Sequence, residues 1–146
     1  MDVPRAIANF RFFSEYSYSF EFEAKLTDDI SKNKVVRSPL GVVGCISPWN
    51  LPLYLFSWKI APALIAGNTV LAKPSELTPY TAFKLGEICQ DSGLPPGVLN
   101  IIHGRGNVAG DALVSHPKIK AVSFPGGTAT GKLLAKTTAS YFKKLS

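Results

Sequence analysis

The sequence is poor in the residues that build metal centres and disulfide frameworks. It has two cysteines, Cys45 and Cys89, far apart in the chain and each in an apolar stretch. Its two histidines, His103 and His116, have no partners at the spacing of a metal site or a catalytic triad. We therefore expect both thiols to be structural, no metal to be bound, and the protein to occupy the reducing cytoplasm.

Long hydrophobic runs are missing as well. The most apolar stretch, residues 51–66, is interrupted by Lys59 and Pro62, and residues 1–7 contain no apolar core of signal-peptide length. Neither stretch predicts a membrane span or a targeting segment. No membrane partner is therefore expected.

Acidic residues are in the minority, since 16 Lys and Arg against 10 Asp and Glu give a net charge of +6 at pH 7. The basic residues are spread along the chain except for a mild cluster at Lys132, Lys136, Lys143 and Lys144. Without a basic stripe or an aromatic platform, such a charge is typical of a solvated surface. No nucleic-acid partner is predicted.

What the chain does contain is a regular alternation of strand and helix patterns from residue 35 onward. With 146 residues, 46% of them hydrophobic, it can bury one core but not two. The predicted strands and helices are, in chain order, strand 41–46, helix 52–66, strand 69–72, helix 79–92, strand 98–102, helix 107–114, strand 119–124 and a helix that opens near 128. This alternation predicts an α/β fold, with an open, mostly parallel sheet and helices on both faces.

Local signals mark the ends of two of these helices. The helix over 52–66 is apolar nearly all round, hence buried, and Gly67 is placed to end it. Thr78 is predicted to cap the next helix ahead of Pro79, and Gly93 to close it. Its predicted core face comprises Ala82, Leu85, Ile88 and Cys89.

The segment before residue 35 has a different pattern. Residues 5–13 predict the tail of an amphipathic helix, with Ile7, Phe10 and Phe13 at helical spacing. Aromatic residues then alternate with Ser and Glu over residues 16–22, which predicts a half-exposed strand. The polar residues 27–34 predict a turn or loop.

Three segments with ligand-binding chemistry follow predicted strands, at the sheet edge where parallel sheets bind their ligands. Asn50 offers a side-chain amide at the start of a buried helix, or serves as an ordinary N-cap. Lys73 and Glu76 suit the vicinal hydroxyls of a ribose, or form a surface ion pair. Residues 126–131 (GGTATG) open a helix, so their amides suit a pyrophosphate, although a flexible glycine turn has the same composition.

The order and spacing of these segments resemble the aldehyde dehydrogenase superfamily over residues 35–134. The sequence of residues 47–54 is most similar to the 2-aminomuconic and hydroxymuconic semialdehyde dehydrogenase branch of this superfamily. The resemblance is carried by GVVGCISPWNLP at 41–52, WKIAPAL at 58–64, GNTV at 67–70, KPSELT at 73–78 and LPPGVLN at 94–100.

The resemblance implies a Rossmann-like, incomplete cofactor domain that binds NAD. In the family a cysteine thiolate attacks the aldehyde, a hydride passes to the nicotinamide, and an activated water hydrolyses the thioester. Asn50 matches the residue whose amide stabilises the oxyanion. Lys73 and Glu76 match the pair that binds the adenosine ribose, where the acidic group favours NAD over its 2′-phosphorylated form.

Further cofactor residues are implied along the same edge. They are Ser47, Pro48 and Trp49 lining the channel, Ser75 beside the ribose pair, Gly106 and Gly110 at the adenine side, and Phe124, Gly126, Gly127, Thr128 and Gly131 at the phosphate side. Two residues at the phosphate side, Gly127 and Pro125, depart from the family pattern. Gly127 stands where Ser is usual and removes a hydroxyl contact, while Pro125 stands where Thr is usual, removes an N–H and restricts Phe124.

No residue of the chain matches the family's nucleophilic cysteine or its general-base glutamate. We therefore expect a fragment, with a remnant N-terminal helix and arm-like segment over 1–34 and a partial dinucleotide-binding domain over 35–146. It is expected to be inactive alone, whereas the complete enzyme would be a homo-oligomer acting on an aldehyde. The alternatives are a non-catalytic nucleotide-binding or interaction module, or a chain that does not persist as a folded species.

Overall fold

The computed structural model describes residues 1–27 and 30–146. It opens with helix α1 and an antiparallel hairpin, and continues with strands and helices in alternation. The elements are α1 (Asp2–Ser19), β1 (Glu23–Thr27), β2 (Lys32–Val36), β3 (Val42–Ile46), α2 (Pro52–Ile65), β4 (Thr69–Lys73), α3 (Tyr80–Asp91), β5 (Leu99–Ile101), a π-helical turn (Gly106–Gly110), α4 (Asp111–Ser115), β6 (Ile119–Ser123), α5 (Thr128–Ala139) and β7 (Lys144–Leu145).

The main sheet has five strands in the order β5-β4-β3-β6-β7, and every pairing in it is parallel. The central strand β3 is buried along most of its length, as its continuous apolar run predicted. Because all five strands run in one direction, their carboxyl ends meet at a single edge. The predicted α/β class with a mostly parallel sheet is confirmed.

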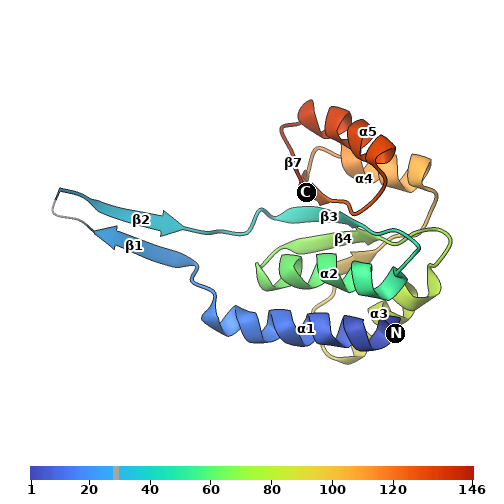
Figure 1. Ribbon diagram of the computed structural model, residues 1–146, viewed down its shortest axis with the longest axis horizontal. Coiled ribbons are helices and arrows are strands. Elements are labelled where there is room, and N and C mark those ends of the chain that lie inside the picture. Colours follow the sequence, from blue (N-terminus) through green and yellow to red (C-terminus); the bar gives the residue numbers. More distant parts are fainter. Residues whose placement is uncertain (28–29) are drawn as a thin grey trace.

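Helices cover both faces of the sheet, as predicted. In Figure 1, α1 and α2 lie on one side of β3 and β4, and α4 and α5 lie on the other. The core under α2 and α3 consists of Val43, Cys45, Phe56, Ile60, Val70, Ala72, Ala82 and Leu85. The core under α4 and α5 consists of Ile46, Leu113, Val114, Ile119, Val122 and Leu134.

The predicted C-terminal glycines end α2 and α3, whereas the predicted N-cap of α3 is absent. Gly67 and Gly93 follow α2 and α3 with φ of +79° and +82°, the left-handed conformation that ends helices. The capping role predicted for Thr78 is wrong, because α3 begins at Tyr80 without a capping side chain and the Thr78 hydroxyl is buried without a partner in the described part of the chain. Ile88 is exposed, so the core face of α3 is narrower than predicted.

The region around the last helices also differs in detail. The helix predicted over 107–114 is a π-helical turn that leads into the short α4. Strand β7 pairs with β6 and has no predicted counterpart, because two residues are too few to give a periodic pattern.

The N-terminal predictions need the largest correction. Helix α1 runs to Ser19, so the strand predicted over 16–22 is wrong. The rings of Phe12 and Tyr16 stack at 6.0 Å, and those of Tyr16 and Phe20 lie 5.8 Å apart. This four-residue spacing fits a helix as well as an alternating strand, which explains the misassignment. Ile7 is exposed, and Asn9 takes its place on the buried face.

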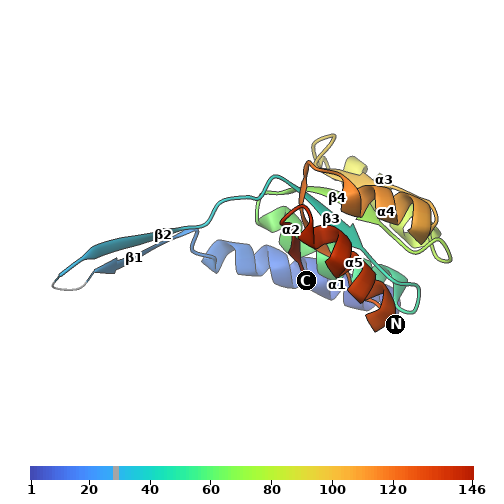
Figure 2. The same ribbon diagram turned by 90° about the horizontal axis from the view of Figure 1, so that it is seen from above.

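The loop predicted over 27–34 is in part a strand. Thr27 ends β1, Lys32 begins β2, and residues 28 and 29 lie outside the described part of the chain. The hairpin of β1 and β2 extends away from the body of the molecule (Figure 1 and Figure 2). None of the helices in the described residues combines the length and the apolarity that crossing a membrane requires.

Candidate functional site

The predicted site residues follow the carboxyl ends of three neighbouring strands. Ser47 follows β3, Lys73 ends β4, and Phe124 follows β6. The amide of Ser47 donates to the carbonyl of Lys73 at 3.1 Å, so the first two strand ends are tied together. The parallel sheet therefore brings these segments, far apart in the sequence, to one edge.

A buried lysine forms the centre of this edge. Lys73 is 2% exposed, and its Nζ donates to the Pro74 carbonyl at 3.1 Å and to Glu76 Oε2 at 3.3 Å. The other carboxylate oxygen, Glu76 Oε1, accepts from the Gly106 amide at 3.3 Å. The three residues thus form a connected corner between β4 and the π-helical turn. A buried charge with a partner is a costly arrangement that active sites commonly contain.

The hydrogen bonds at this corner lower the pKa of Glu76. Amide donors, first its own backbone N–H and then that of Gly106, lower the pKa of Glu76 below its ordinary 4.5, and the nearby Lys73 adds to the effect. Partial burial opposes these donors, and its effect on the pKa is larger than either contribution of Lys73. The carboxylate is therefore ionised at neutral pH, as a hydroxyl-binding acceptor requires.

A cleft of about 280 Å³ opens beside the buried lysine. It lies between the π-helical turn with α4 on one side and α5 on the other. Its walls are formed by Ile46, Lys73, Gly106, Asn107, Gly110, Asp111, Phe124, Thr130, Leu133 and Leu134. Four predicted site residues, Lys73, Gly106, Gly110 and Phe124, thus line one cavity.

The glycine segment reaches this cleft only through Thr130, and the predicted residues Gly126, Gly127, Thr128 and Gly131 are not among its walls. Gly127 is the N-cap of α5 and Thr128 its first residue, while the Gly131 amide donates to the Gly127 carbonyl at 3.0 Å. A Cβ at Gly126 would overlap the ring of Phe124, whereas a Cβ at Gly127 would meet nothing within 4 Å. The segment therefore presents exposed backbone at a helix N-terminus, next to an aromatic ring.

The turn before α2 carries the remaining predicted residues. Ser47 is buried and its hydroxyl has no partner among the described residues, whereas Trp49 is 60% exposed and Asn50 is exposed. The alternative that Asn50 is an N-cap is not supported. Leu51 occupies the N-cap position of α2, and its side chain forms no capping hydrogen bond. These residues and Ser75 lie outside the walls of the cleft.

Sequence reasoning missed Asp2, which caps α2 from α1. Its carboxylate accepts from the amides of Leu53 at 2.8 Å and Tyr54 at 3.0 Å. An Asp that caps its own helix has a recognisable position, but a contact across 51 residues leaves no local signal.

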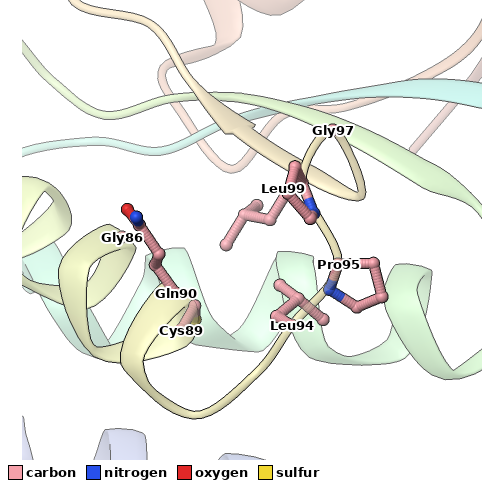
Figure 3. A pocket seen from close by; sticks show the side chains of 8 residues that line it. Gly86, Cys89, Gln90, Leu94, Pro95, Gly97 and Leu99 are labelled. Atoms are coloured by element: carbon pink, nitrogen blue, oxygen red, sulfur yellow. The ribbon is translucent and has the colours of Figure 1, made fainter.

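Neither cysteine forms a wall of the cleft, because Cys45, the penultimate residue of β3, packs in the core under α2 and α3. Burial raises the pKa of the Cys45 thiol to about 12, although the charge of Lys59 acts in the opposite direction, and burial also raises the pKa of Cys89. Cys89 lines an apolar hollow of about 280 Å³ between α3 and the loop that enters β5 (Figure 3). That hollow lies at the amino end of β5. The Cys89 thiol is therefore at the edge of the sheet opposite to the predicted site.

Comparisons with known proteins agree with this geometry. The chain is 50% identical to human 2-aminomuconic semialdehyde dehydrogenase and 46% identical to 2-hydroxymuconic semialdehyde dehydrogenase from Pseudomonas sp. (strain CF600), over all of its length. It superposes on Staphylococcus aureus betaine aldehyde dehydrogenase, solved in complex with NAD+, with a TM-score of 0.92 and 36% identity over 99% of the chain.

The matched part of each relative is limited. The chain spans 30% of the human enzyme, 31% of the Pseudomonas enzyme and 29% of the solved Staphylococcus aureus chain. The sequence model of the aldehyde dehydrogenase family nevertheless matches residues 1–146, and the resemblance seen in the motifs is confirmed. By fold, motifs and family match, this chain belongs to the aldehyde dehydrogenase family.

Proposed function

We propose that residues 1–146 form the NAD-binding part of an enzyme that oxidises an aldehyde to a carboxylic acid. The observation that carries the proposal is the buried Lys73, linked to Glu76 and through it to the Gly106 amide beside an open cleft. A lysine donor and a carboxylate acceptor at one corner match the paired hydroxyls of a ribose. The NAD+ bound by a solved relative supports this choice of cofactor.

The residues present fit the chemical groups of a dinucleotide. Lys73 and Glu76 would hold the adenosine ribose, and the cleft walls around Gly106 and Gly110 would hold the adenine. The exposed N-terminus of α5 would bind the pyrophosphate. When bound, NAD+ supplies the hydride acceptor of the reaction.

The turn before α2 would face the reacting aldehyde. Asn50 is exposed and its side-chain amide forms no hydrogen bond with the described residues, so it is free to donate to a developing oxyanion. The buried, unpartnered hydroxyl of Ser47 is a further polar group that a ligand at this edge can satisfy. Ser75, Pro48 and Trp49 complete the proposed cofactor channel.

The thiolate of the reaction would have to come from another residue than Cys45 or Cys89. The first is buried with a raised pKa and the second lies at the opposite edge of the sheet. Both thiols are free, which supports a reducing cytoplasmic setting. The exposed apolar residues of the projecting hairpin, such as Val36 at 59% exposure, support a homo-oligomeric enzyme.

The similarity to the two muconic semialdehyde dehydrogenases supports a semialdehyde as the substrate. Calorimetric titration of the chain with NAD+ and with its 2′-phosphorylated form tests the cofactor. We expect NAD+ to bind more tightly, and the Glu76→Gln variant to lose most of this preference. Equal affinities in the wild-type chain would contradict the role of Glu76, and no binding of either would overturn the proposal.

A non-catalytic nucleotide-binding module is the second candidate, favoured because neither Cys45 nor Cys89 lines the cleft. The formation of NADH from NAD+ and a semialdehyde measures whether the chain turns over by itself, and turnover would exclude this second candidate. We expect the 146-residue chain to bind NAD+ but to produce no NADH. Turnover by the purified chain would contradict this expectation and would require a nucleophile other than the two cysteines.

A further inference from the structure

The first turn of α2 has no capping side chain of its own. Leu51 occupies the N-cap position without a side-chain hydrogen bond, and Pro52 has no amide hydrogen to donate. The Leu55 amide donates to the Leu51 carbonyl at 3.0 Å. The amides of Leu53 and Tyr54 therefore remain as the unpaired donors of this helix end.

Helix α1 supplies both missing acceptors. Asp2 Oδ2 accepts from the Leu53 amide at 2.8 Å, and Asp2 Oδ1 accepts from the Tyr54 amide at 3.0 Å. A carboxylate at this position also interacts favourably with the positive end of the helix dipole. One side chain of α1 thus caps another helix.

Tyr54 is held by α1 at two further points. Asn9, which is 6% exposed, donates through Nδ2 to the Tyr54 carbonyl at 3.0 Å and to Ser57 Oγ at 2.9 Å. The guanidinium of Arg5 lies over the Tyr54 ring, 5.3 Å from its centroid. Asp2, Arg5 and Asn9 recur at the spacing of one helix face. That face therefore holds the amide, the carbonyl and the ring of a single residue.

The turn that precedes α2 has few other restraints. Within the described residues, neither Trp49 nor Asn50 forms a side-chain hydrogen bond, and both are exposed. Only Leu51 and Pro52 separate Asn50 from Leu53 and Tyr54, the residues of α2 that Asp2 caps. The position of the turn therefore depends on the first turn of α2.

We propose that α1 is a positioning element for the cofactor site, in which Asp2 and Asn9 fix Tyr54 and thereby the turn over residues 48–51. This inference rests on the proposed function, in which that turn lies at the nicotinamide end. The adenosine end is held elsewhere, by Lys73, Glu76 and the walls of the cleft. Loss of the cap is therefore expected to weaken binding at one end of NAD+ only.

The test compares two ligands and four chains. NAD+ reaches both ends of the site, whereas AMP carries only the adenosine end. Asp2→Ala removes both acceptors, Asp2→Asn keeps one carbonyl oxygen, and Glu15→Gln is a control on the exposed far part of α1. We expect Asp2→Ala to weaken NAD+ binding roughly five- to tenfold, the size of effect that follows loss of a helix cap, and to leave AMP binding within about twofold.

The intermediate variant and the control sharpen the result. Asp2→Asn should fall between the wild-type chain and Asp2→Ala, and Glu15→Gln should equal the wild-type chain. Equal weakening of both ligands would mean that α1 only supports the fold, and unchanged NAD+ affinity in Asp2→Ala would mean that the cap does not position the turn. Either result overturns the proposal.

Amide hydrogen exchange separates this inference from the proposed function. If the wild-type chain binds neither ligand, the proposed function fails, while exchange at Leu53 and Tyr54 still tests the cap. We expect both amides to exchange at least about tenfold faster in Asp2→Ala than in the wild-type chain, with no such change in Glu15→Gln. Equal exchange rates in the two chains would overturn the capping role itself.

Discussion

At the scale of single residues, the adjacent glycines Gly126 and Gly127 have different structural roles. A side chain at Gly126 would overlap the ring of Phe124, which lines the cleft, whereas a side chain at Gly127 would enter open space. Gly127 also has an ordinary φ of −67°, so it is under no backbone constraint. The ring of Phe124 therefore depends on Gly126 for its position.

We expect Gly126→Ala to displace this ring and to weaken NAD+ binding by about tenfold, because a wall of the cleft moves. The matched control, Gly127→Ala, should change the affinity by less than about twofold, apart from a small cost at the N-cap. Calorimetric titration of both variants measures the difference. Equal effects would show that Phe124 is not held by its glycine neighbour.

The carboxylate of Glu76 gives the chain a pH dependence that can be isolated. Its folded-state pKa lies below 4.5, so the stabilisation is present above that pH and is lost as the pH falls through the folded-state value. We expect the free energy of unfolding of the wild-type chain to fall more steeply than that of Glu76→Gln between about pH 5 and pH 3. Urea unfolding at several pH values checks this, and parallel curves would contradict it.

Chemistry at the ends of strands was largely predictable from the sequence. The pair Lys73 and Glu76 follows a buried strand, and the ordinary geometry of parallel sheets places such residues at the ligand-binding edge. Asp2 could not be found in this way, since its contact with Leu53 and Tyr54 exists only after two helices pack. The roles of the predicted site residues themselves stay predictions.

At the scale of the elements, the glycines that end α2 and α3 share a conformation but not their surroundings. Both have positive φ, yet a Cβ at Gly67 would lie 2.8 Å from Pro39 Cγ, while one at Gly93 would meet nothing within 4 Å. The left-handed conformation alone costs a non-glycine residue about 1 kcal/mol. Contact with the segment before β3 adds to this cost only at Gly67.

We therefore expect Gly93→Ala to lower the free energy of unfolding by about 1 kcal/mol and Gly67→Ala by about 2 kcal/mol or more. The two variants are each other's control, because both replace a glycine with the same side chain after a helix. Urea denaturation of the two chains measures the difference. If Gly93→Ala proved the more damaging, the contact with Pro39 would not be limiting.

Element types were predictable where periodicity was unambiguous. Strand β3 and helix α2 have one hydrophobic pattern each, and both were assigned correctly from it. Helix α1 was predicted correctly over residues 5–13 but not over 16–19, because Phe12, Tyr16 and Phe20 satisfy a four-residue helical spacing while the Ser and Glu between them also produce alternation. A buried Asn9 in place of Ile7 further hid the true inner face.

At the scale of the whole molecule, the hairpin and the α/β body are largely separate. The five residues of β1 pair with those of β2, and near the base of the hairpin Arg37 donates to the carbonyls of Glu21 and Phe22. Every residue of β2 is exposed. Few interactions therefore connect the hairpin to the packed core, although the predicted boundary at residue 35 stays a prediction.

Replacement of residues 23–36 with a short Gly-Ser linker should consequently leave the body folded. We expect the midpoint of thermal unfolding to change by less than about 3 °C, which corresponds to at most about 1 kcal/mol for a domain of this size. Ile60→Ala, in the centre of the core, serves as the sensitivity control and should cost about 2–5 kcal/mol. A large loss of stability in the linker variant would show that the hairpin belongs to the folding unit.

Helix α2 is enclosed by α1 on one side and the sheet on the other, whereas the first turn of α5 is exposed to solvent. The two sides of the proposed site thus differ in freedom of movement. Motions that admit and release a dinucleotide are expected to occur on the α5 side, around Gly126 and Gly127, while the Asn50 side stays still. Such an asymmetry would let the cofactor exchange without disturbing Asn50, the residue proposed to steady the oxyanion.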